Sequence, residues 1–232
     1  MRESRRIVFA TPHARYDALE NALREVHSLD IVRVREREAV TAERLDALRP
    51  RWIFLPHWSW IVPASVYERF ECVIFHMTDL PFGRGGSPLQ NLIVRGLTET
   101  RLSAIRCEKV LDGGPVYCKR PLSLAGTAEE ILVRAARLME GMVVEIVREG
   151  RVPTPQIGEP TVFLRRSPAE GDIGDLDDLQ RVHDHIRMLD AEGYPSAFLR
   201  AGALRLEFTG SDWAEDHLLA QVSIRISSGR SQ

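Results

Sequence analysis

Short apolar runs alternate with amphipathic stretches through the first half of the chain. The runs predict strands rich in Ile, Val, Phe and Leu, at residues 6–10, 30–34, 51–56 and 72–75. Between them, residues 16–26 place Leu19, Ala22, Leu23 and Val26 on one helical face, and residues 42–48 can form another helix. Strands that alternate with helices predict an α/β fold, here a Rossmann-like, mostly parallel sheet with helices on both faces.

A long helix and a change of composition follow. Thr127 and Glu130 have the spacing of a capping box, and the helix that they start runs to about Arg148. A glycine and two prolines between residues 150 and 155 then end the pattern. We therefore predict a first domain at residues 1–152 and a small α+β appendage at residues 153–232. The appendage pattern predicts a strand, a helix and a β-hairpin, at residues 160–166, 176–189, and 203–208 with 218–226.

The candidate chemistry lies in residues 71–120. His76 follows a buried strand, at the kind of strand end where ligands bind in open parallel sheets. Asp112 closes the alternating stretch 102–111, so two strand ends can bring a carboxylate to an imidazole. Such a pair suits a group that takes and returns a proton. Taken singly, a histidine after a strand is more often structural, and Asp-Gly-Gly is usually a turn.

Composition narrows the class of protein. The 232 residues are 44% apolar and 28% charged, which fits a soluble globular protein. No apolar stretch approaches ~20 residues, so we expect no membrane span. Three cysteines without metal spacing indicate free thiols and a cytoplasmic protein. The net charge of −2 argues against a large nucleic-acid footprint.

An aromatic loop follows the third strand, at residues 57–63. Its tryptophans and histidine can line a pocket for a flat heteroaromatic ring. Packing at the edge of the core is an equally good interpretation of composition alone.

The order and spacing of these residues resemble the folate-dependent formyltransferases, which include methionyl-tRNA, glycinamide ribonucleotide and nucleotide-sugar amine formyltransferases. That family has a strand ending Asn-x-His, a turn ending in Pro, an Arg-Gly loop with a following Pro, and a strand leading to Asp-x-Gly-Pro. The corresponding residues here are Ile74 to Pro81, Arg84-Gly85, Pro88, and Asp112 to Pro115. The chain departs at Ile74, where the family has its catalytic asparagine, and at Asp79, where it usually has leucine.

A second segment resembles the C-terminal domains of the methionyl-tRNA and sugar-amine branches. Residues 186–189 and 193–198 are similar to the family's Arg-Ala-Leu and Pro-Tyr-Pro-Gly-Ala-Phe segments, with departures at Gly193 and Ser196. The match disfavours the glycinamide ribonucleotide branch, which lacks this appendage.

The resemblance implies transfer of a formyl group from N10-formyltetrahydrofolate to a primary amine, without a metal. His76 would handle the protons and, when charged, donate to the oxyanion, and Asp112 would orient and stabilise the charged ring. The residues implied to bind the formyl donor are Trp60, Ile61, Val62, Pro63, Val110, Leu111 and Asp112. The residues implied to bind the acceptor are Arg84, Gly85, Arg187 and Tyr194, although solvated surface arginines are the default interpretation.

Isoleucine at position 74 cannot donate a hydrogen bond. Loss of one oxyanion donor typically costs ~3 kcal/mol, or 10²–10³ in turnover. Thr78 or Asn91 can substitute, His76 can do both jobs, or the protein is an inactive folate-binding module.

For the acceptor, a nucleotide-linked amino sugar is preferred. A methionyl-tRNA-type enzyme would need a longer C-terminal domain and a more basic surface than 232 residues with net charge −2 provide. The methionyl-tRNA type, a formyltetrahydrofolate hydrolase and the inactive module remain alternatives. Family habit also favours a homodimer formed through the appendage.

Overall fold

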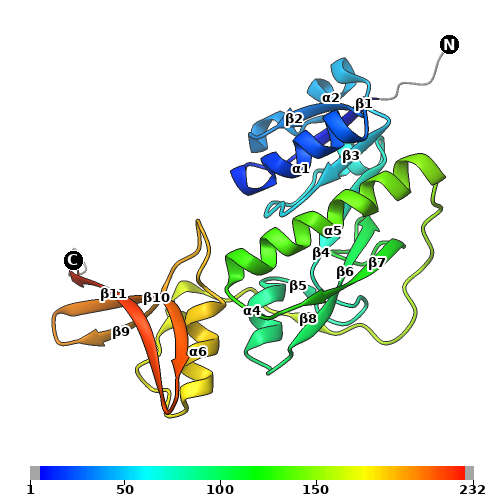
Figure 1. Cartoon of the computed structure of the whole chain (residues 1–232). Coiled ribbons are helices and arrows are strands. Elements are labelled where there is room, and N and C mark those ends of the chain that lie inside the picture. The colour runs from blue at the N-terminus through cyan, green and yellow to red at the C-terminus, as the bar shows by residue number, and fades with distance from the viewer. Residues whose placement is uncertain (1–5, 228–232) are drawn as a thin grey trace. The chain divides into compact units, whose positions relative to one another are not determined.

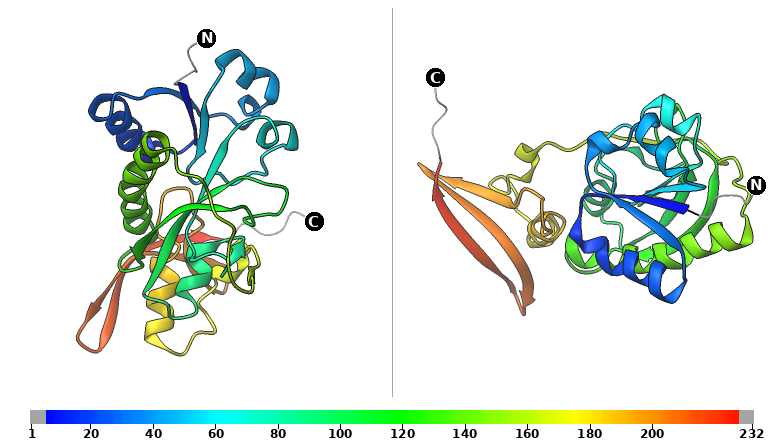
Figure 2. Two further views of the ribbon diagram at one scale, coloured as in Figure 1. Left: turned by 90° about the vertical axis from the view of Figure 1, so that its right-hand side faces the viewer. Right: turned by 90° about the horizontal axis from the view of Figure 1, so that it is seen from above.

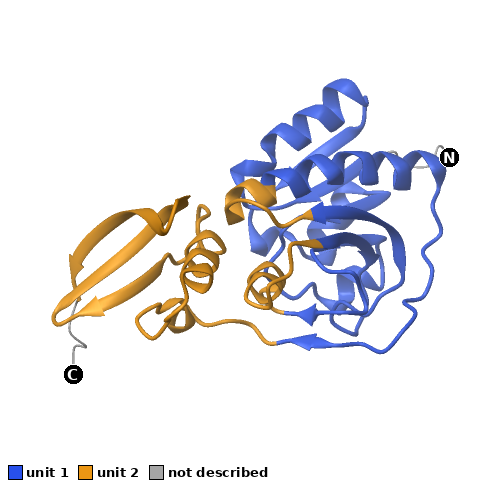
Figure 3. Cartoon of the chain, turned by 60° about the horizontal axis from the view of Figure 1, so that its bottom comes forward, with its two compact units in different colours: residues 1–85, 100–122, 133–163 blue, residues 86–99, 123–132, 164–232 orange. Residues whose placement is uncertain are grey.

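The computed structural model describes residues 6–227 and divides the chain into two compact units (Figure 3). Unit 1 runs up to residue 85 and includes residues 100–122 and 133–163, whereas unit 2 contains residues 86–99, 123–132 and those from 164 onwards. The boundary predicted after residue 152 lies inside unit 1. The division into a first domain at residues 1–152 and an appendage at residues 153–232 stays a prediction.

A mixed sheet forms the centre of unit 1 (Figure 1). Within the described residues it has six strands in the order β2-β1-β3-β4-β6-β7. Their bounds are β1 Arg6–Ala10, β2 Asp30–Val34, β3 Trp52–Leu55, β4 Cys72–His76, β6 Glu99–Arg106 and β7 Val116–Ser123. The neighbouring pairs among β1 to β4 are parallel, and β6 runs antiparallel to β4 with Ser103 opposite His76. The predicted α/β class with a mostly parallel sheet is therefore confirmed.

Helices cover both faces of this sheet (Figure 2). The main ones are α1 Asp17–Asn21, α2 Ala42–Leu48, α3 Ala64–Tyr67 and α5 Ala128–Glu149, and short 3-10 turns are η1 Ala14–Tyr16 and η3 Arg37–Ala39. On one face, Leu45 of α2 and Val66 of α3 pack on the buried side chains of β1 and β3. On the other, Nε2 of His27 lies 2.8 Å from Oε1 of Glu140 in α5. The predicted capping box of α5 is confirmed, since Thr127 and Glu130 exchange backbone-to-side-chain hydrogen bonds of 2.9 and 3.3 Å.

The helix predicted at residues 16–26 is not a regular α-helix. After α1 the chain forms a π-helical turn, η2 Ala22–Val26, in which the His27 amide bonds to the Ala22 carbonyl. A π turn holds more residues than an α turn, so it rotates the following side chains away from the apolar stripe. Leu23 is fully buried, whereas Val26, predicted on the same face, is 72% exposed.

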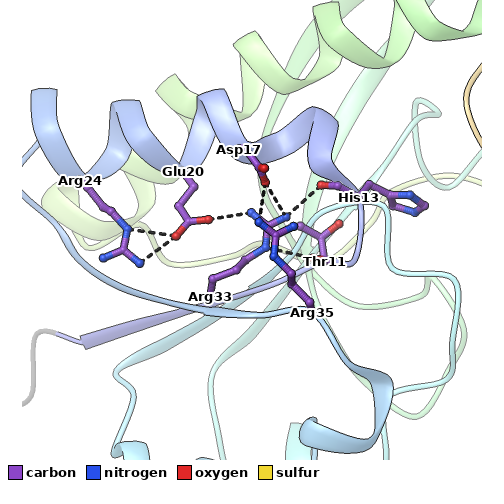
Figure 4. A network of polar contacts seen from close by, with 7 residues as sticks. All are labelled: Thr11, His13, Asp17, Glu20, Arg24, Arg33 and Arg35. Atoms are coloured by element: carbon purple, nitrogen blue, oxygen red, sulfur yellow. Dashed lines mark hydrogen bonds and ion pairs between the residues drawn. The ribbon is translucent and has the colours of Figure 1, made fainter.

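The charged run at residues 33–38 begins inside β2, with an arginine whose side chain is buried, although alternating charges usually form a solvated edge. The Arg33 guanidinium donates to the Thr11 and His13 carbonyls at 3.0 and 2.9 Å, and it pairs with Glu20 at 2.9 Å (Figure 4). Its side chain is only 8% exposed. The loop after β1 leaves backbone carbonyls pointing inward, and a buried arginine with five donors satisfies them.

Unit 2 contains a second, antiparallel sheet of three strands in its described part, in the order β11-β10-β9 (Figure 1). The elements are α4 Pro88–Ile93, η4 Pro168–Gly171, α6 Leu179–Arg187, β9 Ala197–Ala201, β10 Leu204–Ala214 and β11 His217–Ile226. The predicted helix and hairpin are present, and β9 joins the hairpin as a further strand. Ile186 of α6 packs on Ala197 of β9. The predicted strand at residues 160–166 is reduced to β8 Val162–Phe163, which belongs to unit 1.

Other global expectations have mixed outcomes. Cys72, Cys107 and Cys118 are free and buried, as predicted, and burial raises the pKa of Cys107 to about 12 and that of Cys118 to about 11. Among residues 6–227, no helix combines the length and the apolar character that crossing a bilayer requires. The cytoplasmic location and the homodimer stay predictions.

Candidate active site

His76 is the last residue of β4, at the carboxyl edge of the parallel strands. The residue is 6% exposed, and its Nε2 lies 2.8 Å from the Gly83 carbonyl oxygen. A carbonyl can only accept a hydrogen bond, so Nε2 carries the hydrogen. In the neutral ring Nδ1 is therefore the nitrogen with the free lone pair. The ring is oriented by Gly83, a contact that the sequence pattern did not reveal.

Asp112 faces that second nitrogen. Its Oδ2 lies 3.6 Å from His76 Nδ1 and accepts a 2.9 Å hydrogen bond from the Gly85 amide. Both side chains are less than 10% exposed. The structure thus brings together the two residues that the sequence predicted as catalytic, although their roles stay predictions.

Asp112 reaches His76 from a loop and not, as predicted, from the end of a strand. It does not close a strand, because β6 already ends at Arg106. Since β6 is antiparallel to β4, Arg106 lies opposite Val73, at the edge away from His76. The loop between β6 and β7 returns the carboxylate, through a turn in which Asp112 has φ +50°. Aspartate is among the few residues with a side chain that adopt this left-handed conformation readily.

Two side chains from the segment after α5 complete this site, and no sequence pattern indicated them. Gln156 donates through Nε2 to the Asp112 and Gly114 carbonyls, both at 2.8 Å. Thr161 accepts from the Gly83 amide through Oγ1 at 2.7 Å. Both lie in a stretch without apolar periodicity, which the sequence marked only as a linker and a short strand.

The residues predicted to bind the formyl donor divide into exposed and buried ones. Ile61, Val110 and Leu111 are 76%, 59% and 56% exposed, whereas Val62 is 5% exposed and packs in the core with α3. Trp60 stacks edge-on against Trp58, with ring centroids 4.8 Å apart. The side chain of Val62 is thus part of the core, and contact of this loop with the donor stays a prediction.

The aromatic loop offers one donor that suits a pterin. The buried indole Nε1 of Trp58 has no hydrogen-bond partner among the described residues. A buried N–H without a partner costs free energy, so such a group at a loop marks a place where a ligand acceptor fits. Pterin rings carry carbonyl and ring-nitrogen acceptors, so the loop is chemically compatible with this group.

The residues predicted to bind the acceptor make contacts within their own units. In unit 1, Arg84 lies in β5 Arg84–Gly85, which pairs with β8, and its guanidinium donates to Gln156 Oε1 at 3.1 and 2.8 Å. In unit 2, Arg187 pairs with Asp184 at 2.7 Å and donates to the Leu124 and Gly126 carbonyls. Tyr194 is half-buried in the turn before β9. Both guanidinium groups already have partners within the protein. Phosphate binding by either arginine stays a prediction.

The position of the family asparagine holds no donor. Ile74 shares a face of β4 with His76, since alternate strand residues point the same way. Asn91 cannot replace it without breaking contacts, because its amide nitrogen donates to the Gly86, Ser87 and Leu164 carbonyls. Thr78 is fully buried, and its hydroxyl makes only a long 3.4 Å contact with the Gly83 carbonyl. His76 can donate here only from Nδ1, once that nitrogen has gained a proton, because Nε2 is bound to the Gly83 carbonyl.

No described group of three or more His, Cys, Asp or Glu side chains could hold a metal ion.

His57 makes unit 1 sensitive to acid. Its ring is buried and stacks on His13 with centroids 4.4 Å apart. Burial, with smaller effects from His13 and Arg15, lowers the pKa of His57 from 6.5 to about 3. The unfolded chain therefore binds this proton more tightly, and the free energy of unfolding falls as pH drops from about 6.5 to about 3. Urea midpoints measured across this range should decline less steeply in His57→Asn, because asparagine does not bind a proton there. Asparagine is the chosen replacement because it tolerates the positive φ of 50°. Equal slopes in both proteins would contradict the assignment.

Comparison with known proteins supports the same family. The model of the methionyl-tRNA formyltransferase C-terminal domain matches residues 168–225. The solved methionyl-tRNA formyltransferase from Clostridium thermocellum is 41% identical, with a TM-score of 0.93, and the match covers 96% of this chain and 100% of that one. The chain belongs to the formyltransferase family.

The other matched proteins differ in how much of their length is covered. The methionyl-tRNA formyltransferase of Sorangium cellulosum is 34% identical over 147 residues, which are 60% of this chain and 47% of that protein. The chain thus spans about half the length of this curated relative. A sugar N-formyltransferase from a Shewanella species shares the fold alone, with 13% identity and a TM-score of 0.70 over 90% of this chain and 98% of that one.

Proposed function

We propose that this protein transfers a formyl group from N10-formyltetrahydrofolate to a primary amine. The observation that carries the proposal is the buried His76–Asp112 pair, at 3.6 Å, at the end of a parallel strand in a chain of the formyltransferase family. In this reaction the amine nitrogen forms a bond to the formyl carbon, and the bond from that carbon to folate N10 breaks. The amine loses a proton and N10 gains one.

The residues divide these steps between them. His76 Nδ1 accepts the proton of the attacking amine, because Nε2 is already committed to the Gly83 carbonyl. Asp112 then faces a charged imidazolium and stabilises it, since opposite charges at this distance attract strongly in a buried site. The protonated ring returns the proton to N10 as the leaving group departs. While it is protonated, Nδ1 also donates to the oxyanion, given that Ile74 supplies no donor.

Methionyl-tRNA is the acceptor that the relatives support. The Clostridium thermocellum and Sorangium cellulosum proteins are both methionyl-tRNA formyltransferases by name. This outcome favours the alternative over the nucleotide-linked amino sugar that the sequence analysis preferred.

A nucleotide-linked amino sugar remains the second candidate, because of the charge of unit 2. Unit 2, residues 86–99, 123–132 and 164–232, contains fifteen acidic residues against nine arginines and no lysine, a net charge of −6. Binding of a nucleic acid depends on neutralising its phosphates with basic side chains, so such a surface repels tRNA. A small acceptor places no such demand on this unit.

One assay separates these candidates. The protein is incubated with N10-formyltetrahydrofolate and either charged methionyl-tRNA or a panel of nucleotide-linked amino sugars, and the formylated product is identified by mass spectrometry. Turnover with methionyl-tRNA supports the first acceptor, and turnover only with a sugar nucleotide supports the second. Formate release without an acceptor identifies a hydrolase. Folate binding by calorimetry without any turnover would refute the proposed reaction.

A further inference from the structure

The segment after α5 contacts both sides of the His76–Asp112 pair. This bracing segment, residues 154–163, lies entirely in unit 1. At its start, Thr154 exchanges backbone hydrogen bonds of 2.7 and 2.9 Å with Val116, at the beginning of β7. At its end, β8 pairs in parallel with β5. The segment is therefore fixed at both ends to the two loops that supply the site.

Gln156 has every hydrogen-bonding position of its amide in use. Nε2 donates to the Asp112 and Gly114 carbonyls, and Oε1 accepts from both Nε and Nη2 of Arg84. Carbonyls on one side and guanidinium donors on the other determine which amide atom is oxygen. One side chain thus connects the loop of Asp112 to the strand of Gly85, the residue whose amide binds the Asp112 carboxylate.

Asp112 needs such a connection. It lies in a loop beyond the end of β6, with φ +50°, and its neighbours Val110 and Leu111 are exposed. Its carboxylate acts on His76 Nδ1 only while the backbone holds the 3.6 Å separation. A displacement of about 1 Å in a catalytic arrangement can cost roughly 10²-fold in rate.

We infer that Gln156 is a positioning residue, which holds Asp112 against His76 so that the carboxylate stabilises the protonated ring during formyl transfer. This inference rests on the proposed function. Gln156 does not touch the reacting atoms and acts through Asp112. Thr161 plays the matching part for His76, because it binds the amide of Gly83, whose carbonyl orients the ring.

The test compares Gln156→Leu, at a half-buried side chain, with the loss of another hydrogen-bonded glutamine elsewhere. Gln90→Leu is the control, because Gln90 lies in α4 of unit 2 and donates to the Met188 carbonyl. We expect Gln156→Leu to lower kcat by roughly 10- to 100-fold with little change in KM. Gln90→Leu should lose stability and keep kcat. An unchanged kcat in Gln156→Leu, or equal losses of kcat in both variants, would overturn the inference.

A double-mutant cycle shows whether Gln156 acts through Asp112. If it does, Gln156→Leu should reduce kcat little further once Asp112→Asn is present. Full additivity of the two losses would mean that Gln156 acts by another route and would overturn the inference.

Hydrogen exchange separates failure of this inference from failure of the proposed function. Exchange of the amides in residues 107–115 should speed up in Gln156→Leu and stay as in the wild type in Gln90→Leu. A wild-type protein without turnover overturns the formyl-transfer proposal, and the exchange result then decides by itself whether Gln156 holds this loop. Unchanged exchange in an active enzyme overturns only the inference.

Discussion

His76→Ala is expected to lower kcat for formyl transfer by roughly 10²- to 10⁴-fold, the range that general acid–base catalysis contributes. The loss follows because Nδ1 is the nitrogen left free to accept the amine proton, and because Ile74 provides no alternative donor to the oxyanion. Initial rates at saturating acceptor, with N10-formyltetrahydrofolate as donor, measure the effect.

Stability must be separated from chemistry in this variant. Alanine leaves the buried Gly83 carbonyl without its partner, which costs about 1–3 kcal/mol. His76→Asn keeps a donor near that carbonyl and removes the base, so it should fold better and remain as inactive. His27→Ala, at a partly buried histidine of unit 1 that pairs with Glu140, should keep normal turnover. Turnover close to that of the wild type in a folded His76 variant would exclude the proposed mechanism.

Asp112→Asn is the second substitution with a large expected effect. Asparagine has the same shape, tolerates the positive φ, and can still accept the Gly85 amide hydrogen. It removes the negative charge 3.6 Å from the ring. Two charges at about 4 Å interact by about 4 kcal/mol at an effective dielectric constant of about 20, so kcat should fall by up to about 10³-fold.

The control for the second variant is Asp46→Asn, which breaks the ion pair with Arg69 outside the site. Its kcat should equal that of the wild type. We expect thermal melting of Asp112→Asn to stay close to that of the parent protein, so that the loss is one of rate. A fully active Asp112→Asn enzyme would show that the negative charge is not needed and that Asp112 only forms the turn.

The sequence predicted those features whose pattern is local. Apolar runs separated by helical spacing define the parallel strands, and the capping box at Thr127 marks the start of α5. The end of β4 identifies His76 in the same way. Each of these features depends on side chains within a few positions of one another, so one sequence is enough to predict it.

The remaining features depend on contacts between distant residues. The antiparallel direction of β6 decides how Asp112 reaches His76, and no periodicity within residues 99–112 encodes it. The burial of Arg33 depends on two carbonyls that lie 22 and 20 positions away. Gln156 lies 44 positions from Asp112 in a stretch of turn-forming residues. The π turn escapes detection because its apolar residues still fit an α-helical spacing.

The two units are interleaved along the chain, and this limits how the protein can be dissected. A fragment cut after residue 152 would lack Gln156 and Thr161, whose hydrogen bonds hold the loops around the His76–Asp112 pair. Extending it to residue 163 restores them, yet every such fragment still carries residues 86–99 and 123–132 of the other unit. Chimaeras with longer relatives should therefore be joined after residue 163. An isolated unit 1 would require a protein in which its three chain ranges are joined by new connections.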